Sequence, residues 1–143
     1  MTLRAAVLGH PISHSKSPAL HRAAYAKLGV QLDYDAVDVT EEALPAFMAG
    51  VRADGGWRGL SVTMPLKAAM AAEVDDIRGV AGQLGVINTV AFEPVDVPGG
   101  VRTRLVGYNT DVAGIVNALR YAGVAAQPSA VVLGGGGTAA AAI

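Results

Sequence analysis

The sequence predicts an α/β fold built on a largely parallel sheet, with helices on both faces so that the domain has three layers. Two observations support this prediction. Apolar runs typical of buried strands alternate with segments of helical periodicity, as expected for parallel strands joined by helical crossovers. Near the C-terminus, a further apolar run leads into four glycines and a helix-forming segment, which indicates the opening of a second α/β domain.

The composition is that of an ordinary globular protein. The 143 residues suffice for one full domain but not for two, and 52% of them are hydrophobic. The net charge of -1 gives no electrostatic reason to expect nucleic acid or a membrane surface as a partner. Because there is no cysteine and the three histidines lack a second ligand cluster, we expect no metal site. No apolar run is long enough for a signal peptide or a membrane span, so we expect a soluble cytoplasmic protein.

The first half of the chain is predicted to alternate between strands and helices. Ser17 is the expected N-cap and Pro18 the first residue of a helix that Gly29 ends, with the apolar stripe formed by the leucines and alanines at 20, 23, 24 and 28. Thr40 is expected to cap the next helix, with Pro45 near its first turn. The remaining predicted elements are strands over 4–8, 32–39 and 59–63 and short helical segments over 67–74 and 76–83.

The second half is predicted to begin with a hairpin. Strands over 86–92 and 101–106 are separated by the turn-forming sequence Pro98-Gly99-Gly100. Thr110 is expected to cap a helix that ends at Gly123. A short linker over 125–129 then precedes a strand over 130–133, the glycine run 134–137 and a helix start over 138–143.

The densest polar cluster lies between Gly9 and Pro18. In extended backbone Ser15 and Ser17, two residues apart, point the same way, so their hydroxyls can donate to both oxygens of a ligand carboxylate. A helix N-terminus at Ser17 would add a favourable field for that anion. From spacing alone, a plain N-cap at Ser17 and a plain turn residue at Ser15 are somewhat better supported.

Other polar residues are predicted to gather where the third strand ends. Thr63 and Lys67 stand near the C-terminal end of that strand, where open α/β sheets bind ligands. A lysine held there could protonate a ketone oxygen while hydride reaches the carbon, although taken alone Lys67 is better interpreted as a solvated surface residue. Asn88 and Asp111 could bind ligand hydroxyls, and Asp111 could hold the Lys67 ammonium or share its proton. An acidic residue that only complements the helix dipole is an equally good interpretation of Asp111.

The glycine run follows an apolar strand pattern and precedes a helix, which is the context that the dinucleotide fingerprint requires. Gly134, Gly135, Gly136 and Gly137 would let backbone N–H groups approach a pyrophosphate at the helix N-terminus, next to Thr138. Glycine runs by themselves are weak signals. The residue that would recognise the ribose 2′ position is expected further along than Ile143.

Taken in order, these segments resemble the shikimate dehydrogenase family over essentially the whole chain. The family pattern G-x-P-I-x-H-S-x-S-P-x-x-H is matched from Gly9 to His21, although His10 stands where a small polar residue is common. The pattern N-V-T-x-P-x-K is matched from Val62 to Lys67, with Ser61 replacing the usual Asn. The patterns G-x-x-N-T, G-x-N-T-D-x-x-G and G-x-G-G-x-x-x-A are matched by 85–89, 107–114 and 134–141.

The resemblance implies NADPH-dependent, reversible reduction of 3-dehydroshikimate to shikimate in the biosynthesis of chorismate and aromatic amino acids. It implies a shikimate-binding catalytic domain over 1–108, a connecting helix and linker over 109–128, and the start of an NADP-binding Rossmann domain over 129–143. By motif, Ser15 and Ser17 would hold the substrate carboxylate. Thr63 would orient the substrate, Asn88 would bind a ring hydroxyl, and Lys67 and Asp111 would be the catalytic pair. The residues that would line the cofactor are Gly134, Gly135, Gly136, Gly137 and Thr138.

Several alternatives stay open. Members of the family are roughly twice as long, so we expect an N-terminal portion with negligible dehydrogenase activity by itself, since one strand and one turn cannot hold NADP. Quinate or quinate/shikimate dehydrogenase differs by one ring hydroxyl, and a non-catalytic shikimate-binding module is another class of function. The methylene-tetrahydrofolate dehydrogenases also use a lysine but lack the paired serines. The sequence does not decide between NADP and NAD, and it allows a homodimer.

Overall fold

The structure is a computed structural model that describes residues 3–143. A six-stranded mixed sheet forms the centre of the molecule. The strands are β1 (Arg4–Gly9), β2 (Asp33–Asp38), β3 (Trp57–Val62), β4 (Asp76–Ile77), β5 (Thr89–Val97) and β6 (Gly100–Tyr108), in the spatial order β2-β1-β3-β5-β6-β4. The pairings β1–β2, β1–β3 and β4–β6 are parallel, and those of β5 with β3 and β6 are antiparallel. The largely parallel sheet and the predicted hairpin are therefore both confirmed.

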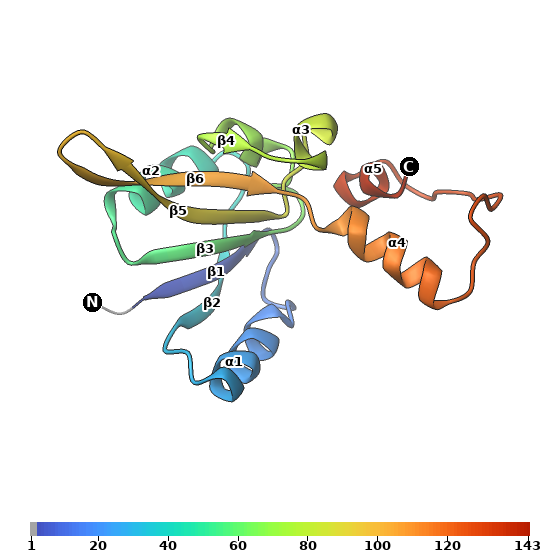
Figure 1. Ribbon diagram of the computed structural model, residues 1–143, viewed down its shortest axis with the longest axis horizontal. Helices are drawn as coiled ribbons and strands as arrows, with labels where there is room; N and C mark the ends of the chain where they lie inside the picture. The colour runs from blue at the N-terminus through green and yellow to red at the C-terminus, as the bar shows by residue number, and fades with distance from the viewer. Residues whose placement is uncertain (1–2) are drawn as a thin grey trace.

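Helices lie on both faces of the sheet, as Figure 1 shows. They are α1 (Ser17–Leu28), α2 (Leu44–Ala53), the 3₁₀ turn η1 (Ala69–Ala72), α3 (Val80–Leu84), α4 (Asp111–Tyr121) and α5 (Gly137–Ala142). α1 covers one face and α2 the other, while α4 and α5 lie side by side beyond the C-terminal end of β6 (Figure 1). The three-layer arrangement predicted from the sequence is thus confirmed for the sheet and its helices.

Alternate residues of β1 enter two separate apolar clusters. Ala6 and Leu8 are fully buried in the larger cluster, which lies on the α2 side and contains Met48. Ala5 and Val7 are buried in the smaller cluster on the α1 side. Because the side chains of a strand alternate between faces, burial of both sets identifies β1 as a central strand covered on both sides.

α1 packs on the sheet through aromatic rings rather than through its aliphatic residues. Leu20 and Leu28 are 69% and 72% exposed, so the stripe predicted from their spacing is not the buried face. Instead, the His21 ring stacks on Tyr34 at 3.9 Å, and Tyr25 meets Tyr34 edge-on. His21 and Tyr25 are four residues apart and share a helix face, which a hydrophobicity pattern that counts only aliphatic residues does not detect.

Of the three predicted helix starts, those of α1 and α2 are wrong and that of α4 is confirmed. The N-cap of α1 is Lys16, so Ser17 is the first helical residue, and its N–H donates to the Ser15 hydroxyl at 3.3 Å. α2 begins at Leu44, and the Thr40 hydroxyl accepts from the N–H of Ala43 in the preceding turn. Thr110 is the N-cap of α4 by position, but its side chain makes no capping hydrogen bond.

The predicted helix over 76–83 is a strand followed by one helical turn. Asp76 and Ile77 pair with the free edge of β6, and only Val80–Leu84 is helical. Gly79, with φ of 63°, turns the chain between the two. The edge of β6 provides backbone hydrogen-bond partners that the local sequence pattern does not reveal. This tertiary pairing outweighs the helix propensity of the segment.

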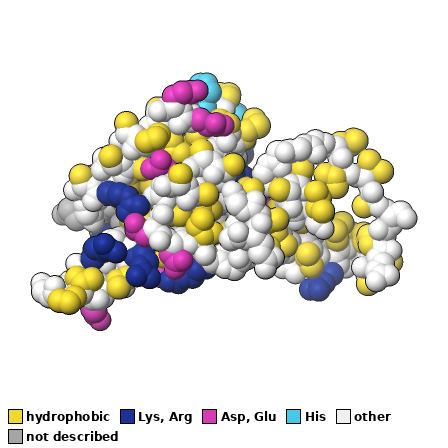
Figure 2. Space-filling view, turned by 90° about the horizontal axis from the view of Figure 1, so that it is seen from above, with side chains coloured by type: hydrophobic (Ala, Val, Ile, Leu, Met, Phe, Trp, Pro, Cys, Tyr) yellow, Lys and Arg dark blue, Asp and Glu magenta, His cyan; other side chains and the backbone are white. Residues whose placement is uncertain are grey.

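The strand predicted over 130–133 is absent. Val131 and Leu133 are 85% and 93% exposed, and the segment pairs with no strand of residues 3–143. A strand needs a neighbour that binds its backbone groups, and here none is adjacent. Figure 2 shows hydrophobic side chains exposed over this end of the molecule.

Within the described residues, no helix has the length and apolar character needed to cross a membrane.

Candidate active site

Four loops meet at one edge of the sheet. They follow β1, β3 and β6 and precede β5, which runs antiparallel to β3 and β6 and therefore starts where those strands end. Backbone hydrogen bonds join the loops: His10 N–H donates to the Met64 carbonyl at 3.1 Å, and Ile87 N–H to the Lys67 carbonyl at 2.8 Å. The Asn88 N–H donates to the Tyr108 carbonyl at 3.0 Å. Every predicted site residue up to Asp111 lies at this edge.

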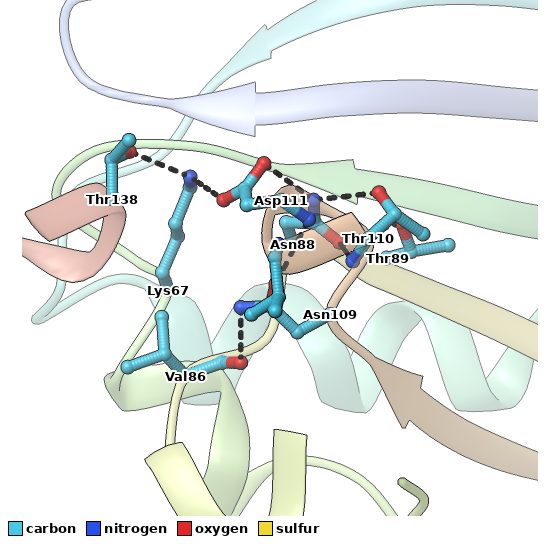
Figure 3. Close-up of polar contacts among 9 residues, drawn as sticks. Lys67, Val86, Asn88, Thr89, Asn109, Thr110, Asp111 and Thr138 are labelled. Atoms are coloured by element: carbon cyan, nitrogen blue, oxygen red, sulfur yellow. Dashed lines mark hydrogen bonds and ion pairs between the residues drawn. The ribbon is translucent and has the colours of Figure 1, made fainter. Parts of the chain in front are cut away.

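Lys67 and Asp111 form an ion pair at the centre of this edge, with Lys67 Nζ 2.6 Å from Asp111 Oδ2. Their side chains are only 14% and 25% exposed. The second carboxylate oxygen, Oδ1, accepts from Asn88 Nδ2 at 2.8 Å (Figure 3). Lys67 comes from the loop after β3, Asn88 from the loop before β5, and Asp111 is the first residue of α4. The predicted contact between Lys67 and Asp111 is therefore present, and Asn88 orients the carboxylate.

The amide of Asn88 has all its hydrogen-bonding capacity engaged. Its Nδ2 donates to Thr110 Oγ1 at 2.9 Å as well as to Asp111, and its Oδ1 accepts from the Thr110 N–H and the Thr89 hydroxyl. A primary amide has two N–H donors and two acceptor lone pairs. A ring hydroxyl can therefore bind Asn88 only by displacing one of these hydroxyl partners.

Asn109 is a positioning residue that sequence reasoning overlooked. It is 9% exposed, and its Nδ2 donates to the Val86 carbonyl at 3.0 Å. Its Oδ1 accepts from the N–H groups of Asp111 and Val112 at the start of α4. Figure 3 shows Asn109 between Val86 and Asp111. The available signal was the Asx pattern, in which an asparagine side chain binds the backbone two residues on. Asn109 thereby fixes the helix start that carries Asp111.

Replacing Asn109 by alanine is expected to destabilise the fold by about 1–3 kcal/mol, because the buried Val86 carbonyl and the first N–H groups of α4 lose their partner. Urea unfolding followed by circular dichroism measures this change. Asn117→Ala, at an exposed position on the same helix, is the matched control and should change stability by less than about 0.5 kcal/mol. Equal losses in the two variants would contradict the assigned role.

The glycine turn before α5 lies against the same lysine. Lys67 Nζ donates to Thr138 Oγ1 at 3.2 Å, and an open pocket of about 630 Å³ is lined by Thr63, Lys67, Val86, the glycines 134–137 and Thr138. A Cβ added at Gly137 would come within 2.9 Å of Val86 Cγ1 and 3.2 Å of Lys67 Cδ, so this close approach requires glycine. Added Cβ atoms at Gly134, Gly135 and Gly136 would meet nothing within 4 Å, which leaves their backbone accessible.

The loop over 10–17, called the serine loop here, lies at the same edge but makes no hydrogen bond to the side chains of Lys67, Asn88 or Asp111. Lys16 has φ of −88° and ψ of −5°, so the extended backbone assumed for Ser15 and Ser17 is wrong. The chain turns there, and the Ser15 hydroxyl accepts from the Ser17 N–H. Both serines are half-buried, and the Ser15 hydroxyl keeps its own proton for donation to a ligand.

Tyr34 forms the floor beneath this loop and was also overlooked. Its side chain is 2% exposed, and its hydroxyl donates to Ser61 Oγ at 2.6 Å. Burial raises the pKa of Tyr34, and hydrogen bonding with Ser61 partly opposes the rise. The ring stacked on it belongs to His21, whose Nδ1 lies 2.8 Å from the Ser17 carbonyl oxygen. The signal for Tyr34 was its place at an inward position of β2.

The fold and the site together define an α/β substrate-binding domain in which a lysine–carboxylate pair faces a dinucleotide-type glycine turn. The family described as "Shikimate dehydrogenase substrate binding domain" matches residues 7–90, so the chain belongs to that family.

Named relatives and solved structures agree with this assignment. The chain is 42% identical over 135 residues to "Shikimate dehydrogenase (NADP(+))" of Thermus thermophilus, covering 94% of this chain and 48% of the relative. The relative from Symbiobacterium thermophilum is 45% identical, with coverage of 93% and 42%. The Thermus thermophilus enzyme in complex with NADP(H) and shikimate superposes with a TM-score of 0.80, covering 97% of this chain and 49% of that one. Shikimate dehydrogenase 1 of Peptoclostridium difficile, 28% identical, gives a TM-score of 0.84 with coverage of 98% and 49%. The chain thus spans about half the length of the curated relatives it matches.

Proposed function

We propose that this chain provides the shikimate-binding and acid–base part of an NADP-dependent shikimate dehydrogenase, an oxidoreductase that interconverts shikimate and 3-dehydroshikimate. The observation that carries the proposal is the 2.6 Å ion pair between Lys67 and Asp111, largely shielded from water beside the glycine turn. The proposed organisation is a substrate domain over 1–108, a connecting helix and linker over 109–128, and the start of the cofactor domain over 129–143. A homodimer stays a prediction that light scattering tests.

Lys67 supplies the proton in the proposed reaction. An ammonium has three N–H donors, of which one is directed to Asp111 and one to Thr138, so one is left for the substrate oxygen. In the reduction, that proton passes to the carbonyl oxygen, which becomes the new hydroxyl. In the reverse direction, the lysine amine takes the proton back. Asp111 holds the ammonium in place and offsets its charge.

The other site residues hold the substrate. Ser15 and Ser17 donate to the shikimate carboxylate, Thr63 orients the ring from the end of β3, and Asn88 binds a ring hydroxyl in exchange for one of its present hydroxyl partners. The backbone at Gly134–Gly136 is accessible and so suits a pyrophosphate, with Gly137 and Thr138 completing the turn. When bound there, NADPH supplies the hydride. The name and ligands of the Thermus thermophilus relative support the choice of NADP and shikimate.

Replacing Ser15 or Ser17 by alanine is expected to weaken shikimate binding to the 143-residue chain by about tenfold or more, because each hydroxyl contributes a hydrogen bond to a charged group. Isothermal titration calorimetry, supported by NMR titration at millimolar ligand, measures the change. Ser13→Ala, at an exposed position of the same loop, is the control and should leave affinity unchanged. If the unaltered chain binds no shikimate at millimolar concentration, the proposed substrate is wrong.

A further inference from the structure

The carboxylate of Asp38 ties the serine loop to the neighbouring strand. Asp38 is the last residue of β2 and lies beside Gly9, the last residue of β1. Its Oδ1 lies 2.6 Å from His10 Nδ1, and its Oδ2 accepts the backbone N–H of Ile12 at 3.2 Å. One carboxylate therefore holds two positions of the loop as it leaves the sheet.

From Asp38, a path of hydrogen bonds leads to both serines. Ile12 is only 3% exposed, and its side chain packs in the cluster that contains Tyr34. Side-chain packing therefore holds Ile12 in addition to its backbone hydrogen bond to Asp38. The Ile12 carbonyl accepts from the Ser15 N–H at 2.9 Å, and the Ser15 hydroxyl accepts from the Ser17 N–H at 3.3 Å. The position of both hydroxyls thus depends on where Ile12 is held.

The charges at this corner keep the carboxylate available as an acceptor. Hydrogen bonding with His10 lowers the pKa of Asp38, so Asp38 stays ionised at neutral pH and can accept from both partners. Both side chains of the His10–Asp38 pair are about half exposed, at 51% and 52%, so water screens the attraction between them. The pair therefore contributes little to the free energy of unfolding and acts mainly by orienting the Asp38 carboxylate.

We propose that Asp38, supported by His10, is a positioning residue that sets the two serines for a ligand carboxylate. The inference rests on the proposed function, because it concerns the serines that bind the shikimate carboxylate there. It adds a contribution from β2, a strand to which sequence reasoning gave no part in the site. In this arrangement His10 holds the Asp38 carboxylate through the contact between Nδ1 and Oδ1.

The test compares two ligands that differ only in the group that the serines bind. Shikimate and its methyl ester share the ring and its hydroxyls, but the ester has no carboxylate. Asp38→Ala is expected to weaken shikimate binding by about tenfold and to change binding of the ester by less than about twofold. Dissociation constants come from NMR titration of the 143-residue chain, which measures millimolar affinities.

Asp35→Ala is the matched control, since Asp35 is an exposed residue of the same strand that pairs with Arg22 on α1. It should leave both affinities unchanged. If Asp38→Ala does not fold, as judged by circular dichroism, Asp38→Asn replaces it, and because its amide oxygen can still accept the Ile12 N–H, it should lose about two- to fivefold toward shikimate alone. Equal losses for both ligands, or no loss for shikimate, would overturn the inference. If the unaltered chain binds the ester but not shikimate, or binds neither, the proposed function fails as well.

Discussion

Replacing Lys67 by methionine is expected to lower kcat for 3-dehydroshikimate reduction by about 10²- to 10⁴-fold, the range that a positioned general acid contributes. Methionine keeps much of the apolar stem that packs near Gly137 and Val86, but it removes the proton donor. Because the serines are untouched, the dissociation constant for shikimate should change by less than about fivefold, which is about 1 kcal/mol. The expected signature is thus a loss in kcat rather than in binding.

The measurement requires a protein of the relatives' full length, since residues 1–143 span about half of it. Residues 1–143 joined to the remaining half of the Thermus thermophilus relative, whose structure contains NADP(H) and shikimate, allow NADPH oxidation to be followed by absorbance. Lys27→Met, in the exposed last turn of α1, is the control and should keep full activity. A Lys67→Met enzyme with kcat near that of the unaltered fusion would show that another group supplies the proton.

Gly9→Ala is expected to destabilise the domain by about 1–3 kcal/mol and to weaken shikimate binding, because the new methyl group has no space. A Cβ at Gly9 would lie 2.7 Å from Thr63 Cγ2, 2.9 Å from the Met64 carbonyl oxygen and 3.0 Å from Ile12 Cδ1. The carbonyl belongs to the backbone and cannot rotate away as a side chain can. The loops after β1 and β3 must therefore separate, and both carry site residues.

Urea unfolding and shikimate titration of the same Gly9→Ala preparation measure the two effects together. Gly50→Ala is the control, since a Cβ there meets nothing within 4 Å and the position is inside α2. Alanine in a helix interior should stabilise by about 0.5–1 kcal/mol and leave binding unchanged. A Gly9→Ala domain that is as stable as the unaltered chain and binds shikimate normally would mean that the two loops can separate without cost.

Much of the site could be located from the sequence because its residues follow strand patterns. Thr63 and Lys67 come after β3, and Asp111 comes after β6, so the C-terminal ends of the predicted strands already indicate one edge. The contact between Lys67 and Asp111 was foreseen as opposite charges that could meet there. The hydrogen-bond partners of Asn88 were not predicted. The sequence does not distinguish an asparagine that binds a ligand from one whose amide is hydrogen-bonded to Thr110 and Thr89.

What the sequence by itself determined is the α/β class, the hairpin, the glycine that ends α1 and the edge at which the site lies. These depend on periodicity and turn chemistry within a few neighbouring residues, and such information is local. The tertiary structure alone decided that α1 packs on the sheet through aromatic rings and that Asp76–Ile77 extends the sheet. It also decided that the apolar run over 130–133 pairs with no strand of residues 3–143. The tertiary structure decided as well that Asn109 binds the first N–H groups of α4 and that Asp38 binds the N–H of Ile12. Most of these outcomes depend on a partner distant in the chain, and local sequence patterns do not specify such partners.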